Sequence, residues 1–297
     1  MYPCVKMDAK TRYYNDKISD CQGDQKALFR IVNSLIGKSN ESPLPECDSA
    51  ASLSEKLCDF FVKKIVTIRD ALSVLEGTST LSCPSVTSLM KCSEVKLQEF
   101  ALATCDEVAK IISESSKTSC PLDPMPTKLL INLLPELLPV ITHIVNLSLT
   151  TGIFPDALKT ALVYPLIKKL TLDPNLFKSF RPVSHLSFLS KIIEKIIAKR
   201  LFQHLIENDL LEQMQSAYKP CHSTETALLK VQNDILGLLD KGQCVYLALL
   251  DLSAAFDTVD HEVLLEILES YVGIEGPALS LLRSYLTQRT QCVVVEN

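Results

Sequence analysis

The chain has 297 residues, of which 47% are hydrophobic and 22% charged, a composition typical of globular rather than disordered proteins. Its net charge of −5 argues against a protein that binds nucleic acid over its whole surface, because such domains carry a basic excess. The 11 cysteines include no C-x-x-C pair, so we expect no zinc framework. The odd cysteine count and the absence of a signal-peptide pattern in MYPCVKMDAK indicate free thiols and a soluble cytoplasmic or nuclear protein.

The first hundred residues are expected to form helices separated by loose segments. Residues 24–37 place apolar side chains at helical spacing and end at Gly37, which predicts an amphipathic helix that stops at this glycine. Residues 52–76 predict a second helix, with Ser52 or Ser54 as its cap. The stretch GTSTLSCPSVTS that follows is typical of a linker.

Two further segments precede residue 150. Residues 104–116 predict a short capped helix. Residues 129–149 are apolar enough to suggest a membrane span, but they contain two prolines, a glutamate, a histidine and two asparagines, and no Lys/Arg cluster flanks them. We therefore expect buried helices broken by Pro135 and Pro139 and no membrane partner.

A basic segment begins near residue 159. ALVYPLIKKL predicts a short strand, and KIIEKIIAKRLFQHLIEND predicts a long helix. Between Lys159 and Leu205 the basic residues exceed the acidic ones by seven. The basic residues of the helix are expected to form an ordinary solvated face; they are Lys191, Lys195, Lys199 and Arg200. The basic residues in the turns are better placed to contact a polyanion such as a nucleic-acid backbone; they are Lys168, Lys169, Lys178 and Arg181.

The segment LLDLSAAFDTVDHEVLL, residues 249–265, contains the strongest candidate for a catalytic residue. The preceding apolar run VYLALL lacks polar alternation and predicts a strand that is buried on both faces and ends at Asp251. A carboxylate at such a strand end can hold Mg²⁺, which prefers oxygen ligands and few protein groups. Two alternatives stay open: Asp251 or Ser253 caps the following helix, or the site is a strand-D-x-D phosphatase, which Ser253 disfavours.

The same segment resembles the first catalytic palm motif of reverse transcriptases from non-LTR retrotransposons (LINE elements), a strand followed by D-x-x-x-A-F-D-x-V-x-H. KTSCPLDPMPTKLL is similar to the family's opening block, and FKSFRPVSHLSFLSKIIEKIIAKRL resembles its Y-R-P-I-S-L-L motif and the helix after it. QMQSAYKPCHSTETAL is similar to the Q-x-G-F-R-x-x-x-S-T-x-x-A-L block of the fingers. Four blocks in the family's order, over about residues 110–297, make this a specific resemblance.

The resemblance implies an RNA-directed DNA polymerase that acts on an RNA template, a DNA primer and deoxynucleotides. Asp251 is then the metal-binding aspartate, with the Leu252 carbonyl assisting. Phe256 is the aromatic that excludes the 2′-hydroxyl of the incoming sugar, while Arg181 and Lys219 contact template or triphosphate. The implied fold class is α+β, a right-hand polymerase fragment with fingers and half a palm.

The expected organisation is a helical extension over residues 1–110 and a partial reverse transcriptase domain over 111–297. Lys219 replaces an arginine of the family motif, and Cys221 replaces a glycine, which is expected to strain its turn. No adjacent Asp-Asp pair occurs in the chain, so the motif with the remaining metal carboxylates is expected to lie beyond Asn297. The fragment alone is then expected to be inactive; a non-catalytic nucleic-acid-binding module and a relic of a decayed element are the rival hypotheses.

Overall fold

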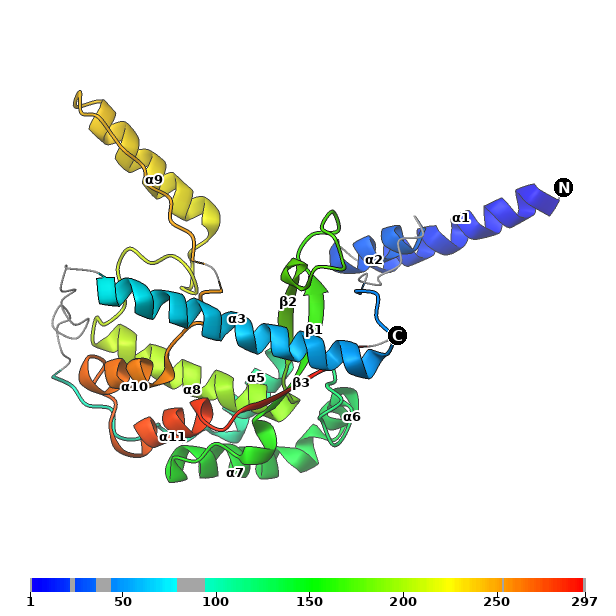
Figure 1. Cartoon of the computed structure of the whole chain (residues 1–297). Coiled ribbons are helices and arrows are strands. Elements are labelled where there is room, and N and C mark those ends of the chain that lie inside the picture. Colours follow the sequence, from blue (N-terminus) through cyan, green and yellow to red (C-terminus); the bar gives the residue numbers. More distant parts are fainter. Residues whose placement is uncertain (1, 22–24, 36–43, 79–93, 253, 296–297) are drawn as a thin grey trace. The chain divides into compact units, whose positions relative to one another are not determined.

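The computed structural model describes residues 2–21, 25–35, 44–78, 94–252 and 254–295 (Figure 1). The elements in chain order are α1 (Tyr2–Asp20), α2 (Gln25–Leu35), α3 (Ala50–Thr78), α5 (Cys105–Glu114), α6 (Thr127–Asn132), α7 (Leu134–Thr151), η1 (Asp156–Leu158), β1 (Thr160–Ile167), η2 (Phe177–Ser179), β2 (Phe180–His185), α8 (Phe188–Glu207), α9 (Thr224–Leu239), α10 (His261–Ser270), α11 (Gly276–Leu286) and β3 (Thr290–Val293). Helices and a small sheet together confirm a mixed α/β protein.

The chain divides into two compact units. Unit 1 comprises residues 1–46 and 166–181, and unit 2 comprises residues 47–165 and 182–297. Within unit 1, the amide of Glu46 donates to the side-chain oxygen of Asn175 at 3.1 Å. The amide of Lys168 donates to the Ser179 carbonyl at 2.9 Å and closes the loop between β1 and β2. Unit 2 contains the main hydrophobic core.

This core is built from helices of unit 2 whose apolar residues recur at helical spacing. Its members from α8 are Ile192, Ile193, Ile196 and Ile197, all of them buried. Helices α5, α7, α10 and α11 add further members; they include Val108, Ile112, Val145, Leu149, Leu265 and Leu281. Phe100 and Ala103 belong to the same cluster, so the segment before α5 is part of this core.

The sheet has three strands in the order β2-β1-β3. Strand β3 pairs in parallel with β1, with Thr160 opposite Thr290 and Val163 opposite Val293. The strand predicted over ALVYPLIKKL is therefore confirmed as β1. The apolar segment QCVVVEN at the C-terminus suggested a strand that would pair with the strand predicted to end at Asp251. This expectation is wrong, because β3 pairs with β1. Strand β2 was not predicted from the sequence, because Pro182 disfavours a strand.

Most predicted helices are present, with small shifts at their ends. Helix α5 has Thr104 as its N-cap, and the Thr104 hydroxyl accepts from the Glu107 amide at 3.2 Å. Helix α3 begins two residues earlier than expected. The Ser49 hydroxyl, rather than that of Ser52 or Ser54, accepts from a first-turn amide. The linker predicted over residues 77–88 falls almost wholly outside the described residues.

The apolar segment 129–149 forms two helices rather than one span. Helix α6 ends at Asn132, and α7 starts at Leu134 with Pro135 in its first turn, where a missing amide hydrogen costs nothing. Pro139 lies inside α7 without ending it, so only the first of the two prolines marks a break. No helix in the described part of the chain is long and apolar enough to cross a membrane.

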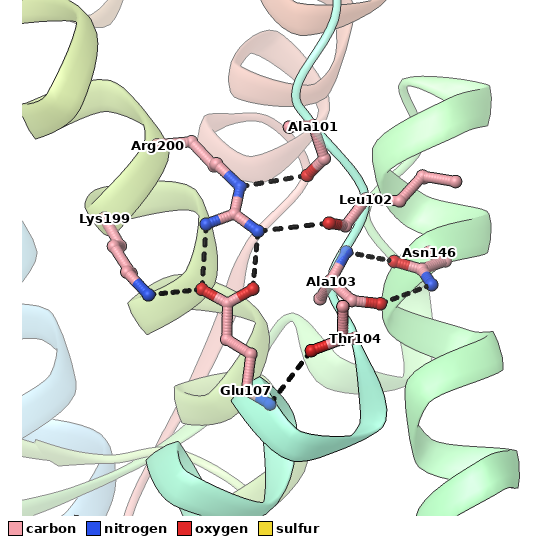
Figure 2. A network of polar contacts seen from close by, with 8 residues as sticks. All are labelled: Ala101, Leu102, Ala103, Thr104, Glu107, Asn146, Lys199 and Arg200. Atoms are coloured by element: carbon pink, nitrogen blue, oxygen red, sulfur yellow. Dashed lines mark hydrogen bonds and ion pairs between the residues drawn. The ribbon is translucent and has the colours of Figure 1, made fainter.

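A polar network fastens the segment before α5 to α8 (Figure 2). The Arg200 guanidinium donates to both carboxylate oxygens of Glu107, at 2.8 and 2.6 Å, and also to the carbonyls of Ala101 and Leu102. The Lys199 ammonium lies 2.5 Å from the same carboxylate. Because the Arg200 side chain is only 11% exposed, it does not belong to the solvated helix face that the sequence suggested.

Candidate active-site segment

Residues 244–252, which include Asp251, do not form the buried strand that the sequence predicted. They have no regular secondary structure, and Tyr246 and Leu250 are 96% and 94% exposed. A strand needs a neighbour to accept and donate its backbone hydrogen bonds. Among the described residues, no other strand pairs with this segment. The carboxylate of Asp251 is consequently presented on exposed chain rather than at a rigid strand end.

Phe256 lies against the turn that contains Lys219. Its ring makes an edge-to-face contact with Tyr218, with ring centroids 6.0 Å apart and an interplanar angle of 76°. Both rings are otherwise exposed, Phe256 at 76%. The structure thus brings together two segments that are 38 positions apart in the sequence, both of them expected to contribute to the site. Tyr218 was not singled out from the sequence, although it precedes Lys219 directly in the similar block.

The turn from residue 212 to 223 is held by hydrogen bonds of its own. The Lys219 ammonium donates to the Glu212 carbonyl, and the Gln215 amide donates to the Ala217 carbonyl at 3.3 Å. Ser223 caps α9 in a reciprocal capping box with Thr226.

Two residues of this turn have left-handed backbone conformations, Tyr218 and Cys221, each with φ of 61°. Such a conformation is costly for a residue with a Cβ atom and easy for glycine. The expectation that Cys221 occupies a strained glycine position is therefore confirmed. A third left-handed residue, Ala254 with φ of 56°, begins the turn that leads to Phe256.

Asp260, the second acid after Phe256, stabilises the start of α10. One Asp260 carboxylate oxygen accepts from the amides of Glu262 and Val263, at 2.9 and 3.2 Å. These two hydrogen bonds, first that from Val263, lower the pKa of the Asp260 carboxyl. Asp260 is thus the N-cap of α10, and His261 is its first helical residue.

The remaining basic candidate, Arg181, is an exposed residue of β2 and belongs to unit 1. In the loop that precedes it, the Lys168 ammonium donates to the Lys178 carbonyl at 2.8 Å. Lys169 and Lys178 are also exposed. Asp173 is the one acid of this loop, so unit 1 presents a locally basic surface that could contact phosphates.

Asp251 and its neighbours supply only part of the ligand set that Mg²⁺ requires. Asp251 offers one carboxylate, and the Leu252 carbonyl is adjacent in the chain. Among the described residues no three His, Cys, Asp or Glu side chains gather closely enough to hold an ion. Mg²⁺ often binds through one or two carboxylates and completes its shell with water and substrate phosphates. Among the described residues, Asp251 therefore provides one carboxylate ligand of such a site.

Comparison with known proteins bears on the same part of the chain. Residues 167–295 match the family model described as reverse transcriptase (RNA-dependent DNA polymerase). The chain is 31% identical over 195 residues to the RNA-directed DNA polymerase from mobile element jockey of Drosophila melanogaster. The aligned residues make up 65% of the chain and 21% of that protein. The chain is also 31% identical over 154 residues to the probable RNA-directed DNA polymerase from transposon BS of the same species, covering 52% and 17%. The chain thus spans about a fifth of the length of these relatives.

Proposed function

Since residues 167–295 match the reverse transcriptase family model, we propose that the chain is part of an RNA-directed DNA polymerase that copies the RNA of a LINE-type retrotransposon. The mobile-element relatives confirm the resemblance to retrotransposon reverse transcriptases that the motifs indicated. The observation that carries the proposal is the family match over the segment that contains D-L-S-A-A-F-D at 251–257. Residues 111–297 are assigned to fingers and part of a palm, and residues 1–110 to a helical extension.

Asp251 is the residue we assign to the metal. Divalent ions serve reverse transcriptase domains generally, and in nucleotidyl transfer they activate the attacking oxygen and neutralise the leaving one. The Asp251 carboxylate, with the Leu252 carbonyl beside it, would hold one Mg²⁺ together with the phosphates of the incoming deoxynucleotide. The exposure of Asp251 leaves its oxygens accessible to such a complex.

Phe256 is assigned to sugar selection and Lys219 to phosphate binding. An aromatic ring under the sugar leaves no space for a 2′-hydroxyl, so ribonucleotides are excluded by steric clash. The contact between Phe256 and Tyr218 places this ring beside the turn of Lys219, which supports a shared substrate site. Arg181 is assigned to the template or the triphosphate, where its planar guanidinium suits phosphate oxygens.

A second function is favoured by the basic loop of unit 1 and the basic excess over residues 159–205. In this alternative the chain binds nucleic acid without catalysis. Binding that depends on phosphate contacts weakens steeply as salt rises, and for single strands the logarithmic slope is about −0.7 per phosphate neutralised. A salt series with a short RNA measures this slope directly.

Primer extension on an RNA template tests the polymerase proposal. The protein is the complete reading frame that contains this chain, supplied with Mg²⁺ and deoxynucleotides. Asp251→Ala is expected to reduce extension by about a thousandfold, on the scale of a lost metal interaction. The matched control is Asp234→Ala, which removes an exposed acid of α9 that pairs with Lys230, and it should extend normally. Full activity in Asp251→Ala would overturn the assignment.

The sugar-selection role has a separate test in the same assay. Phe256→Val is expected to raise incorporation of ribonucleotides relative to deoxynucleotides, because the smaller side chain makes room for the 2′-hydroxyl. An unchanged ratio would remove this role from Phe256. The 297-residue chain alone, which supplies no adjacent Asp-Asp pair, is expected to give no extension, and robust synthesis would contradict that expectation.

A further inference from the structure

A surface pocket of about 440 Å³ lies in unit 2 where the end of α5 faces α8. Its principal lining residues are Ser115, Ser116, Phe188, Lys191, Glu194 and Lys195. The sequence predicts an ordinary solvated face for the basic residues of α8. The structure divides the basic residues of this helix instead: Lys199 and Arg200 bind Glu107, whereas Lys191 and Lys195 border the pocket.

The two pocket lysines form no ion pair with a carboxylate of the described residues. They are four positions apart on α8 and therefore lie on the same side of the helix. The Lys195 ammonium donates to the Ser115 hydroxyl at 2.7 Å, and that hydroxyl in turn donates to the Ile111 carbonyl at 2.6 Å. Within the described part of the chain, neither ammonium has a carboxylate oxygen within 4 Å. Lys195 thus retains two of its three donors for a ligand.

The one acid of the lining, Glu194, interacts with other groups. Its carboxylate accepts from the Ser190 hydroxyl at 3.2 Å and lies 3.9 Å from the Arg289 guanidinium. Burial raises the pKa of the Glu194 carboxyl, and the positive charge of Arg289 opposes that rise. Arg289 and Lys191 both interact electrostatically with Glu194, so the lining has two lysines against one carboxylate whose charge is shared with Arg289, and the pocket is net basic.

We propose that this pocket binds a backbone phosphate of single-stranded nucleic acid, held between the ammonium groups of Lys191 and Lys195 and the hydroxyl of Ser116. The inference rests on the proposed function, because an RNA-copying polymerase must hold a flexible single strand. Because the sugar-phosphate backbone of a single strand is flexible, one of its phosphates can enter a concave site. The apolar part of the lining, chiefly the Phe188 edge and the lysine stems, suits the attached sugar.

The first measurement maps lysine reactivity on the unaltered 297-residue chain. The chain is treated with an acetylating reagent with and without a short oligouridine that forms no secondary structure, and modified lysines are quantified by mass spectrometry. Lys191 and Lys195 are expected to be protected by the oligouridine. Lys110, an exposed lysine of α5, is the internal control and should react equally in both samples. Equal reactivity of Lys191 and Lys195 in both samples overturns the proposal.

The second measurement compares affinities across a salt series. The double variant Lys191→Ala/Lys195→Ala is expected to bind the oligouridine about tenfold more weakly, and its logarithmic salt slope should be shallower by about 0.7, the value for one phosphate. Lys110→Ala is the matched control and should keep the affinity and slope of the unaltered chain. Equal behaviour of the double variant and the control overturns the proposal, as does an unaltered chain that does not bind.

The outcome is separable from that of the polymerase proposal. If Lys191 and Lys195 are protected but the complete frame gives no primer extension, the pocket stands and the polymerase proposal falls. If extension depends on Asp251 while the two lysines react equally with and without oligouridine, the polymerase proposal stands and the pocket proposal falls.

Discussion

The ion pair between Glu107 and Arg200 gives a quantitative prediction about stability. The Arg200 and Lys199 hydrogen bonds hold the pKa of the Glu107 carboxyl at about 2, against an ordinary value of 4.5, although burial acts in the opposite direction. The two side chains are 14% and 11% exposed, so solvent screens their interaction only in part. A pKa lowered to this extent corresponds to about 3 kcal/mol of stability at neutral pH.

The perturbation is Glu107→Gln, which keeps the shape of the side chain and removes its charge. We expect the free energy of unfolding at pH 7 to fall by about 3 kcal/mol, measured by urea denaturation. Because the folded pKa is depressed, the contribution of the ion pair is complete above pH 4.5 and is lost as the pH falls toward 2. The difference between the unaltered chain and the variant should therefore shrink over that interval.

The control is Glu114→Gln, which neutralises an exposed acid at the end of the same helix. A change at such a surface position is expected to alter stability by less than about 0.5 kcal/mol. Equal stabilities of Glu107→Gln and Glu114→Gln at pH 7 would refute the reasoning. So would a difference between the unaltered chain and Glu107→Gln that stays constant from pH 7 to pH 2.

Three further substitutions test other parts of unit 2 by urea denaturation. Gly152→Ala should lower the free energy of unfolding by about 2 kcal/mol, because Gly152 has φ of 69° and a Cβ atom would lie 2.9 Å from the Pro277 carbonyl oxygen. An unchanged stability would contradict that close contact. Asn146→Ala should lower the free energy of unfolding by about 2 kcal/mol, because the Asn146 side chain accepts a hydrogen bond from the amide of buried Ala103 and donates one to its carbonyl (Figure 2). A loss below about 0.5 kcal/mol would show that water replaces these hydrogen bonds. Cys221→Gly should raise stability by up to about 1 kcal/mol through relief of the left-handed conformation, and a lower stability would argue against strain there.

Elements whose stabilising contacts are local were predictable from the sequence. Helix α5 and its Thr104 cap, helix α8 and the break before α7 follow from helical spacing, capping residues and a proline. The strained position of Cys221 was predictable because the similar motif has glycine there and a Cβ is costly in the left-handed region. In each case the relevant interactions lie within a few residues along the chain.

Elements that depend on distant partners were decided by the tertiary structure. Residues 244–250 have the apolar character of a buried strand, but a strand forms only beside another strand, and β3 pairs with β1 instead. The Arg200 ion pair joins residues 93 positions apart, and the Phe256 contact with Tyr218 joins two segments of the candidate site. Spacing along the chain cannot indicate such pairs, because the folded core fixes which helix faces meet.

The sequence by itself therefore determined the resemblance to reverse transcriptases, the candidate carboxylate Asp251 and the local helices. The tertiary structure decided the environments of the charged residues: Arg200 in a buried ion pair, Lys191 and Lys195 beside a pocket, and Asp251 on exposed chain. The physical reason is that motif identity and helix periodicity are properties of neighbouring residues. Burial and charge pairing depend on which distant segments pack together.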